Sequence, residues 1–299
     1  MTNKQTEQFH AQAQGLDLRP ATEILQLLAA GQVAASASVE AAIPQIARAA
    51  NTAAQTVREG GRLIYAAAGS SGLMALADAL ELPGTYGIER RQVVVLLAGG
   101  TEALQDLRGG PEDDGEAAAA AVKALRPGPK DTLIALTASG HTPYPVAAAK
   151  AAQAAGARTI GFANNAGAIL FDHVDVAVCL PTPPEVIAGS TRMGAGTAQK
   201  IALNMLSTLM AIELGHVHDG MMVNVIADNE KLRGRARGIV MAAAQVDDAT
   251  AAKALETSQG AVKPAILIAA GASPKQASQL LSMHGDMLRP ALAELAKSL

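Results

Sequence analysis

Residues 131–143 read DTLIALTASGHTP, an apolar run followed by a loop of small and hydroxyl-bearing residues and then by a proline. The run predicts a buried strand over 131–137, and we expect a helix to follow as far as residue 155. A continuously apolar strand that leads into a helix is typical of a parallel sheet with helices on both faces. This stretch therefore predicts an α/β fold.

The same order of strand, loop and helix recurs on both sides of that stretch. It predicts further strands over 62–66, 92–98, 159–163 and 174–180, and helices over 73–80 and 193–214. An irregular arm, 1–19, and two helices, 20–30 and 36–59, precede the first strand. Ligands of such sheets bind at the carboxyl ends of the strands, which is where the loops rich in serine and glycine fall.

The end of the chain has a different pattern, with short helical stretches separated by glycines. We expect a helical continuation from 229 to 244, and then helices over 249–258, 262–270, 274–283 and 287–299. The sequence thus predicts N-terminal helices within 1–59, an α/β domain over 60–246 and a small all-helical module over 247–299.

Composition excludes several classes of partner. The chain has 299 residues, only 2% of them aromatic, a net charge of −3 and scattered basic residues, so we expect no nucleic-acid binding. A single cysteine, Cys179, fits a reducing compartment. The polar start of the chain and the lack of a long charge-free apolar run predict no signal peptide, no membrane span and a cytoplasmic location.

Two loops at strand ends have the composition of anion-binding turns. Small residues let backbone N–H groups approach an anion, and hydroxyls add donors. Because the loops match neither a P-loop nor a dinucleotide-binding pattern, they favour a phosphorylated small molecule over a nucleotide. The candidate binding residues in them are Ser70, Ser71, Gly72, Ser139, Gly140, His141 and Thr142.

A third candidate is the stretch 185–200, EVIAGSTRMGAGTAQK, which leads into the predicted helix over 193–214. Ser190 and Thr191 stand at the expected N-cap, so that free N–H groups and hydroxyls would face an anion. Arg192 adds a cation, and Glu185 opens the stretch. An ordinary capped helix is the alternative interpretation.

Acidic and histidine residues are less informative on their own. Glu81 lies among apolar residues, which would favour the protonated carboxyl of a general acid, but a solvated glutamate at a helix end is the alternative. Glu112 lies in an acidic loop that reads as a solvated turn. His216, His218 and Asp219 lack a further ligand cluster, so we expect no metal site.

Taken together, these segments resemble the SIS (sugar isomerase) fold and, within it, the N-acetylmuramic acid 6-phosphate etherase family. The resemblance spans about residues 60–240, and the family has a C-terminal helical module as well. It rests on GSTRMGAGTAQK (189–200), LNMLST (203–208), NEKL (229–232) and PGTYG (83–87). It implies a three-layer fold, a homodimer, a sugar phosphate substrate and no metal or organic cofactor.

The resemblance also implies a reaction and its two catalytic residues. The family removes the D-lactyl ether from C3 of N-acetylmuramic acid 6-phosphate, giving N-acetylglucosamine 6-phosphate and D-lactate by elimination and hydration. DALELP (78–83) matches the family's D-A-S-E-C-P, which makes Glu81 the acid, and GPED (110–113) matches G-A-E-D, which makes Glu112 the base. Two carboxyl groups in different environments suit such an elimination.

Three departures from the family pattern concern charge. Leu73, His141 and Gly194 stand where the family usually has arginine, arginine and lysine. Each lost charge-assisted contact to an anionic substrate is worth about 1.5–3 kcal/mol. The alternatives are therefore a lyase or isomerase that acts on another sugar phosphate, or a non-catalytic phosphosugar sensor.

Overall fold

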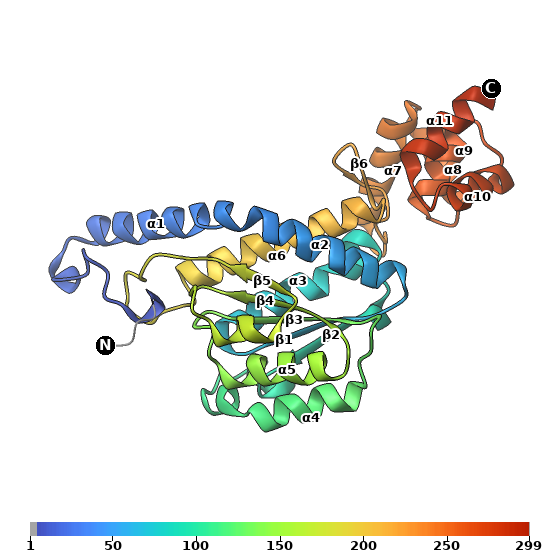
Figure 1. The fold of residues 1–299 in the computed structure, drawn as a ribbon. Helices are drawn as coiled ribbons and strands as arrows, with labels where there is room; N and C mark the ends of the chain where they lie inside the picture. Colours follow the sequence, from blue (N-terminus) through green and yellow to red (C-terminus); the bar gives the residue numbers. More distant parts are fainter. Residues whose placement is uncertain (1–4, 299) are drawn as a thin grey trace. The chain divides into compact units, whose positions relative to one another are not determined.

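The computed structural model describes residues 5–298, and it contains a five-stranded parallel sheet in the order β2-β1-β3-β4-β5 (Figure 1). The strands are β1 (Leu63–Ala67), β2 (Val93–Leu97), β3 (Thr132–Thr137), β4 (Arg158–Ala163) and β5 (Val176–Cys179). All five lie within the predicted runs or extend them by one residue. Residues 1–4 of the predicted arm, and Leu299, lie outside the described part of the chain.

The register of the sheet aligns the carboxyl ends of its central strands. Ala67 of β1 pairs with Leu97 of β2, and Leu136 of β3 stands opposite Ala67 on the other side. Every residue of β1 and β3 is buried, as expected for strands covered on both faces. The loops that follow these strands therefore meet at one edge of the sheet.

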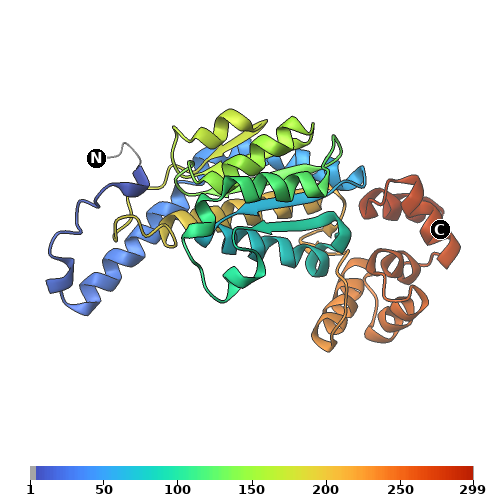
Figure 2. The ribbon, with the colours of Figure 1, turned by 90° about the horizontal axis from the view of Figure 1, so that it is seen from below.

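Helices cover both faces of the sheet, so the predicted three-layer α/β fold is confirmed. On one face, α4 (Gly115–Leu125) packs beside α5 (Pro143–Ala154), as the view from below shows (Figure 2). On the other lie α2 (Ile43–Arg58), α3 (Gly69–Tyr86) and α6 (Gly194–Glu213). The buried Tyr65 hydroxyl of β1 donates to Asp78 of α3 (2.9 Å), and Ser207 of α6 donates to the same carboxylate (2.8 Å).

Several helix boundaries differ from the predicted ones. The first helix, α1 (Ala21–Ala37), extends seven residues beyond residue 30, through Gly31, which packs against Val186. The loop expected between the strand over 62–66 and the helix over 73–80 is mostly the first turn of α3, which also continues past Pro83. Helix α4 was not predicted, because its run of alanines shows no amphipathic period. Short 3-10 turns complete the elements: η1 (Gln5–Glu7), η2 (Leu16–Leu18), η3 (Glu40–Ala42), η4 (Arg90–Gln92), η5 (Gly100–Leu104), η6 (Gly110–Asp113) and η7 (Ile169–His173).

The chain divides into two compact units. Unit 1 comprises the described residues up to Ala79 together with Arg91–Ser207, and unit 2 comprises Leu80–Arg90 with the described residues from Thr208 onward. Unit 2 has a hairpin, β6 (Val217–His218) and β7 (Met221–Met222), and the helices α7 (Glu230–Ala244), α8 (Asp248–Thr257), α9 (Val262–Ala269), α10 (Pro274–Met283) and α11 (Leu288–Ser298). The predicted C-terminal helices are confirmed, whereas the division at residues 59 and 246 stays a prediction.

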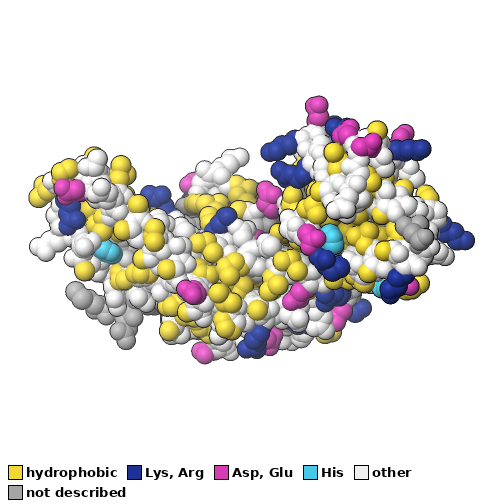
Figure 3. Space-filling model, turned by 90° about the horizontal axis from the view of Figure 1, so that it is seen from above, with side chains coloured by type: hydrophobic (Ala, Val, Ile, Leu, Met, Phe, Trp, Pro, Cys, Tyr) yellow, Lys and Arg dark blue, Asp and Glu magenta, His cyan; other side chains and the backbone are white. Residues whose placement is uncertain are grey.

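Helix α1 exposes apolar side chains. Leu25 is 65% exposed and Val33 is 68% exposed, and Ala35 alone among the residues of α1 is buried. Hydrophobic side chains gather on the face that carries α1 and α2, seen from above (Figure 3). By length and mean hydropathy, the helical stretch Ala21–Arg58 would suffice to cross a membrane, although the sequence predicted no such helix. Its second half, α2, instead packs on the sheet through residues such as Ile46 and Ala53.

Candidate active site

A pocket of about 240 Å³ opens in unit 1 where the loops after the central strands meet. We call it the serine pocket. Its polar lining is dominated by hydroxyls and two carboxylates. It is lined by Glu7, Ala68, Gly69, Ser70, Ser71, Glu112, Leu136, Thr137, Ala138, Ser139, Thr142, Gly189 and Thr191.

Six of the predicted site residues come together in this pocket: Ser70, Ser71, Glu112, Ser139, Thr142 and Thr191. Seven do not line it: Gly72, Glu81, Gly140, His141, Glu185, Ser190 and Arg192. The two strand-end loops and the acidic loop after β2 thus converge, although they are far apart in the sequence.

The first wall of the pocket is the start of α3. Gly69 has a left-handed backbone (φ 52°), and Ser70 and Ser71 lie in the first helical turn. The N–H groups of this turn and the helix dipole make it suited to an anion. Gly72 serves packing instead, since a Cβ there would come within 2.3 Å of the Leu97 side chain.

The second wall is the loop between β3 and α5, whose hydroxyl groups are hydrogen-bonded within the loop and to the end of β3. The Thr137 Oγ1 atom lies 2.8 Å from Thr142 Oγ1, and the His141 N–H donates to Ser139 Oγ (3.1 Å). The His141 ring is turned to its own loop, with Nδ1 2.9 Å from the Ser139 carbonyl oxygen. Gly140, with φ 78°, packs closely on Ala168.

The Glu112 carboxylate lies against the start of α3. A Cβ on Gly69 would come within 2.5 Å of Glu112 Oε1, so the absence of a side chain at residue 69 admits the carboxylate. Burial raises the pKa of the Glu112 carboxyl above its ordinary value, and the neighbouring Asp113 raises it further. The predicted solvated turn is therefore a half-buried part of the pocket.

Glu81 lies elsewhere. It comes twelve residues after Gly69 in α3, more than three helical turns along, and its side chain is exposed. Thr85 donates a hydrogen bond to its carboxylate (3.3 Å). Among residues 5–298 the expected apolar surroundings of this carboxyl are not found, because Leu82 is buried while Leu80 and Glu81 are exposed.

The start of α6 corrects the prediction made for Ser190 and Thr191. The helix begins at Gly194, and its first N–H groups are taken by the buried carboxylate of Glu185. Gly194 N donates to Glu185 Oε2 (2.9 Å), and Ala195 N donates to Oε1 (2.8 Å). A carboxylate from the same chain thus occupies the place at which we expected a phosphate. Arg192 is exposed and does not line the pocket.

Sequence reasoning missed two polar residues of the pocket. Thr137 is the last residue of a predicted strand, so its hydroxyl at the carboxyl end was a usable signal. Glu7 lies in the N-terminal arm, 105 positions before Glu112, and nothing in the sequence connects the two. None of the described residues that line the pocket is a lysine or an arginine, so hydroxyls and a helix start would have to hold an anion here.

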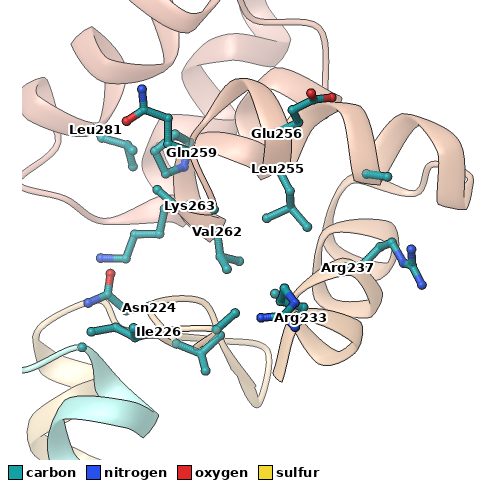
Figure 4. Close-up of a pocket in the computed structure, with 18 of the residues that line it drawn as sticks. Asn224, Ile226, Arg233, Arg237, Leu255, Glu256, Gln259, Val262, Lys263 and Leu281 are labelled. Carbon is teal, nitrogen blue, oxygen red and sulfur yellow. The ribbon is translucent and has the colours of Figure 1, made fainter. Parts of the chain in front are cut away.

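Unit 2 contains a larger pocket of about 790 Å³ (Figure 4). Its walls are largely apolar, with Ile226, Leu255 and Val262 facing the space. Two of its cations are engaged, since Arg237 pairs with Asp248 and the buried Lys263 pairs with Asp286. Because no loop at the end of a strand contributes hydroxyls, the smaller serine pocket is the better candidate site. Among residues 5–298, no three His, Cys, Asp or Glu side chains are grouped as metal ligands would be.

Comparisons with known proteins show the family of the chain. The SIS domain family matches residues 28–164. An N-acetylmuramic acid 6-phosphate etherase from Deinococcus radiodurans is 43% identical over 292 residues, which cover 97% of this chain and 96% of that one. Another from Symbiobacterium thermophilum is 47% identical over 231 residues, covering 77% and 76% of the two chains. Among solved structures, a phosphoheptose isomerase from Francisella tularensis matches 65% of this chain and 98% of its own, at 20% identity and a TM-score of 0.49.

The match to the Deinococcus radiodurans etherase covers 97% of this chain and therefore extends through both units. The chain belongs to the N-acetylmuramic acid 6-phosphate etherase family.

Proposed function

We propose that this protein cleaves the D-lactyl ether of N-acetylmuramic acid 6-phosphate to N-acetylglucosamine 6-phosphate and D-lactate. The observation that carries the proposal is the half-buried Glu112 carboxylate at the start of α3, inside a hydroxyl-lined pocket of a chain from this family. The elimination requires a base, and the helix start beside Glu112 is suited to the phosphate of the substrate.

In this proposal the hydroxyls bind the phosphate and the Glu112 carboxylate removes a proton. Ser70 and Ser71 with the start of α3, and Ser139 and Thr142 from the facing loop, would hold the phosphate. In the ring-opened sugar the C1 aldehyde acidifies the C2 hydrogen, and Glu112 removes that proton. A carboxylic acid protonates the departing lactate oxygen, and water then adds to the unsaturated aldehyde. The raised pKa of Glu112 makes it a stronger base.

The acid of this proposal is Glu81 of a second copy of the chain. Glu81 is exposed and does not line the serine pocket of its own chain. Helix α1 exposes Leu25 and Val33, an apolar surface that a homodimer would cover. The proposal therefore includes a homodimer, and with it a cytoplasmic enzyme that recycles cell-wall sugar.

Because none of the described residues that line the pocket is a lysine or an arginine, one alternative is favoured, a lyase or isomerase acting on a sugar phosphate without a lactyl carboxylate. The three positions that are usually cationic bring no lysine or arginine to the pocket: they are Leu73, Gly194 and His141, and the His141 ring is turned to Ser139 and does not line the pocket. Turnover of another hexose phosphate, with N-acetylmuramic acid 6-phosphate inert, would select this alternative.

The test is D-lactate release from N-acetylmuramic acid 6-phosphate by the parent protein and by Glu112→Gln, Glu81→Gln and Asp113→Asn. We expect the two catalytic variants to lose about 10²–10⁴-fold in kcat, the usual effect of removing a general acid or base. Asp113→Asn, the matched control in the same loop, retains most activity. A parent protein that releases no D-lactate refutes the proposal.

Mixing the two inactive variants tests where the acid comes from. In a mixed dimer of Glu81→Gln and Glu112→Gln, one of the two sites keeps both carboxyl groups if Glu81 acts across the dimer. Random exchange of subunits would then restore about a quarter of the parent activity. A mixture that stays inactive after verified exchange, or a protein that light scattering shows to be monomeric, contradicts the arrangement.

A further inference from the structure

The N-terminal arm brings a second carboxylate into the serine pocket. Glu7 lines the pocket together with Glu112, although η1, which contains it, belongs to none of the elements that form the sheet or its layers. We propose that Glu7 is a substrate-binding residue that accepts a hydrogen bond from a ring hydroxyl or the acetamido N–H of the sugar. The inference rests on the proposed function in so far as a phosphosugar occupies this pocket.

The arm is fixed at the pocket by Thr6, which is only 1% exposed. The side chain of Asn165, itself 5% exposed, donates to Thr6 Oγ1 (3.1 Å) and accepts from the Thr6 N–H (3.4 Å). The same Asn165 amide donates to the carbonyl oxygens of Ala138 (3.0 Å) and Ser139 (3.2 Å). One buried amide thus connects the arm to the loop that carries two of the pocket hydroxyls.

The Glu7 carboxylate itself has no hydrogen-bond or ion-pair partner among residues 5–298. Its Oε2 atom lies beside Gly189, 3.5 Å from the place that a Cβ on that residue would take. A carboxylate held at a pocket without an internal donor is free to accept hydrogen bonds from a ligand.

Charge decides what Glu7 would bind. The pocket already contains Glu112, and none of residues 5–298 lines it with a lysine or an arginine, so a second carboxylate opposes the binding of a phosphate. A sugar offers the opposite chemistry, because its hydroxyls and amide N–H are donors. Glu7 is therefore suited to the sugar and not to the phosphate, and it would contribute to selection of the sugar.

If Glu7 contacts the sugar and not the phosphate, a single substitution should change the affinities for two ligands differently. Glu7→Gln removes a charge while keeping the size of the side chain. We expect it to weaken binding of N-acetylglucosamine 6-phosphate about tenfold and to leave inorganic phosphate binding equal or tighter. Calorimetry on the full-length protein measures both dissociation constants. In the lactate assay the loss should lie mainly in KM.

Two further variants separate binding from placement of the arm. Thr6→Val removes the hydroxyl that Asn165 contacts and should weaken sugar binding as Glu7→Gln does. Thr6→Ser keeps the hydroxyl and should bind the sugar as the parent does. Gln8→Ala, the exposed neighbour of Glu7, is the control and should bind both ligands as the parent does. Thermal unfolding of each variant shows whether the fold is intact.

The inference is overturned if Glu7→Gln binds the sugar phosphate within twofold of the parent. It is equally overturned if the variant weakens sugar phosphate and inorganic phosphate in parallel, since that result indicates a purely structural arm. Because binding is measured without turnover, a parent protein that releases no D-lactate refutes the proposed reaction but leaves the test of Glu7 valid.

Discussion

Replacement of Glu185 by glutamine should destabilise the protein strongly while leaving phosphosugar binding nearly unchanged. The Glu185 carboxylate is 5% exposed and accepts from the N–H groups of Gly194 (2.9 Å) and Ala195 (2.8 Å) at the start of α6. Both oxygens are used, and no serine or threonine takes either bond. The side chain therefore acts as the cap of a 20-residue helix.

The magnitude follows from these two bonds. A glutamine presents one carbonyl oxygen and one NH₂ group, so one of the two N–H groups would face a donor. Leaving that buried N–H unpaired costs about 1–3 kcal/mol. Loss of the negative charge at the helix start removes about another 0.5–2 kcal/mol. Together the two contributions amount to about 1.5–5 kcal/mol.

Urea unfolding followed by circular dichroism measures this loss. Glu23→Gln is the matched control, because Glu23 is also in the first turn of a helix but is exposed to solvent. It should lose at most about 0.5–1 kcal/mol. If Glu185→Gln is no less stable than this control, the capping role is wrong. A loss of phosphosugar affinity above tenfold at unchanged stability would show that Glu185 binds ligand, as the sequence suggested.

Two further predictions concern pH. Asp131 accepts hydrogen bonds from the Arg62 backbone N–H (2.8 Å) and from the Arg62 guanidinium. Burial would raise the pKa of the Asp131 carboxyl, but these bonds and a hydrogen bond from the Gly128 N–H hold it below its ordinary value. A group with a depressed pKa in the folded state stabilises above its unfolded pKa, so Asp131→Asn should cost about 1–3 kcal/mol at pH 7. The difference in unfolding free energy between parent and variant should shrink as pH falls below about 4. Urea unfolding at several pH values measures it, and a difference that stays constant contradicts the prediction. For Glu112, burial and Asp113 raise the pKa, so the acid limb of kcat/KM should lie above the ordinary glutamate range. Asp113→Asn should move that limb to lower pH, and a pH-rate profile with an unmoved or raised limb argues against Glu112 as the base.

The sheet and the strand-end loops were predictable because their signals are local. Continuous apolar runs mark strands buried on both faces, and the topology of a parallel sheet brings the loops that follow them to one edge. Ser71 and Ser139 could be placed together in this way without knowledge of any contact.

The wrong or missing predictions for the site concern contacts between residues that are not adjacent in the sequence. Ser190 and Thr191 have the residue types of a cap, but the Glu185 carboxylate, folded back over nine residues, takes the N–H groups first. Thr6 meets Asn165 across 159 positions of chain, so no local pattern could place the arm at the pocket. Helix α4 was not predicted for a different reason. Its alanines favour a helix, but a run of alanines shows no alternation of polar and apolar residues from which a helix is recognised.

The close approach of Glu112 to Gly69 has a consequence for how such a protein can evolve. The carboxylate occupies the space that any side chain at residue 69 would need, and the left-handed backbone there adds a second requirement for glycine. A mutation at residue 69 would displace Glu112 even though it alters no catalytic group. The two positions, 43 apart in the sequence, are therefore constrained together: a lineage that loses the glutamate removes one of the two requirements for glycine, while the left-handed backbone keeps the other.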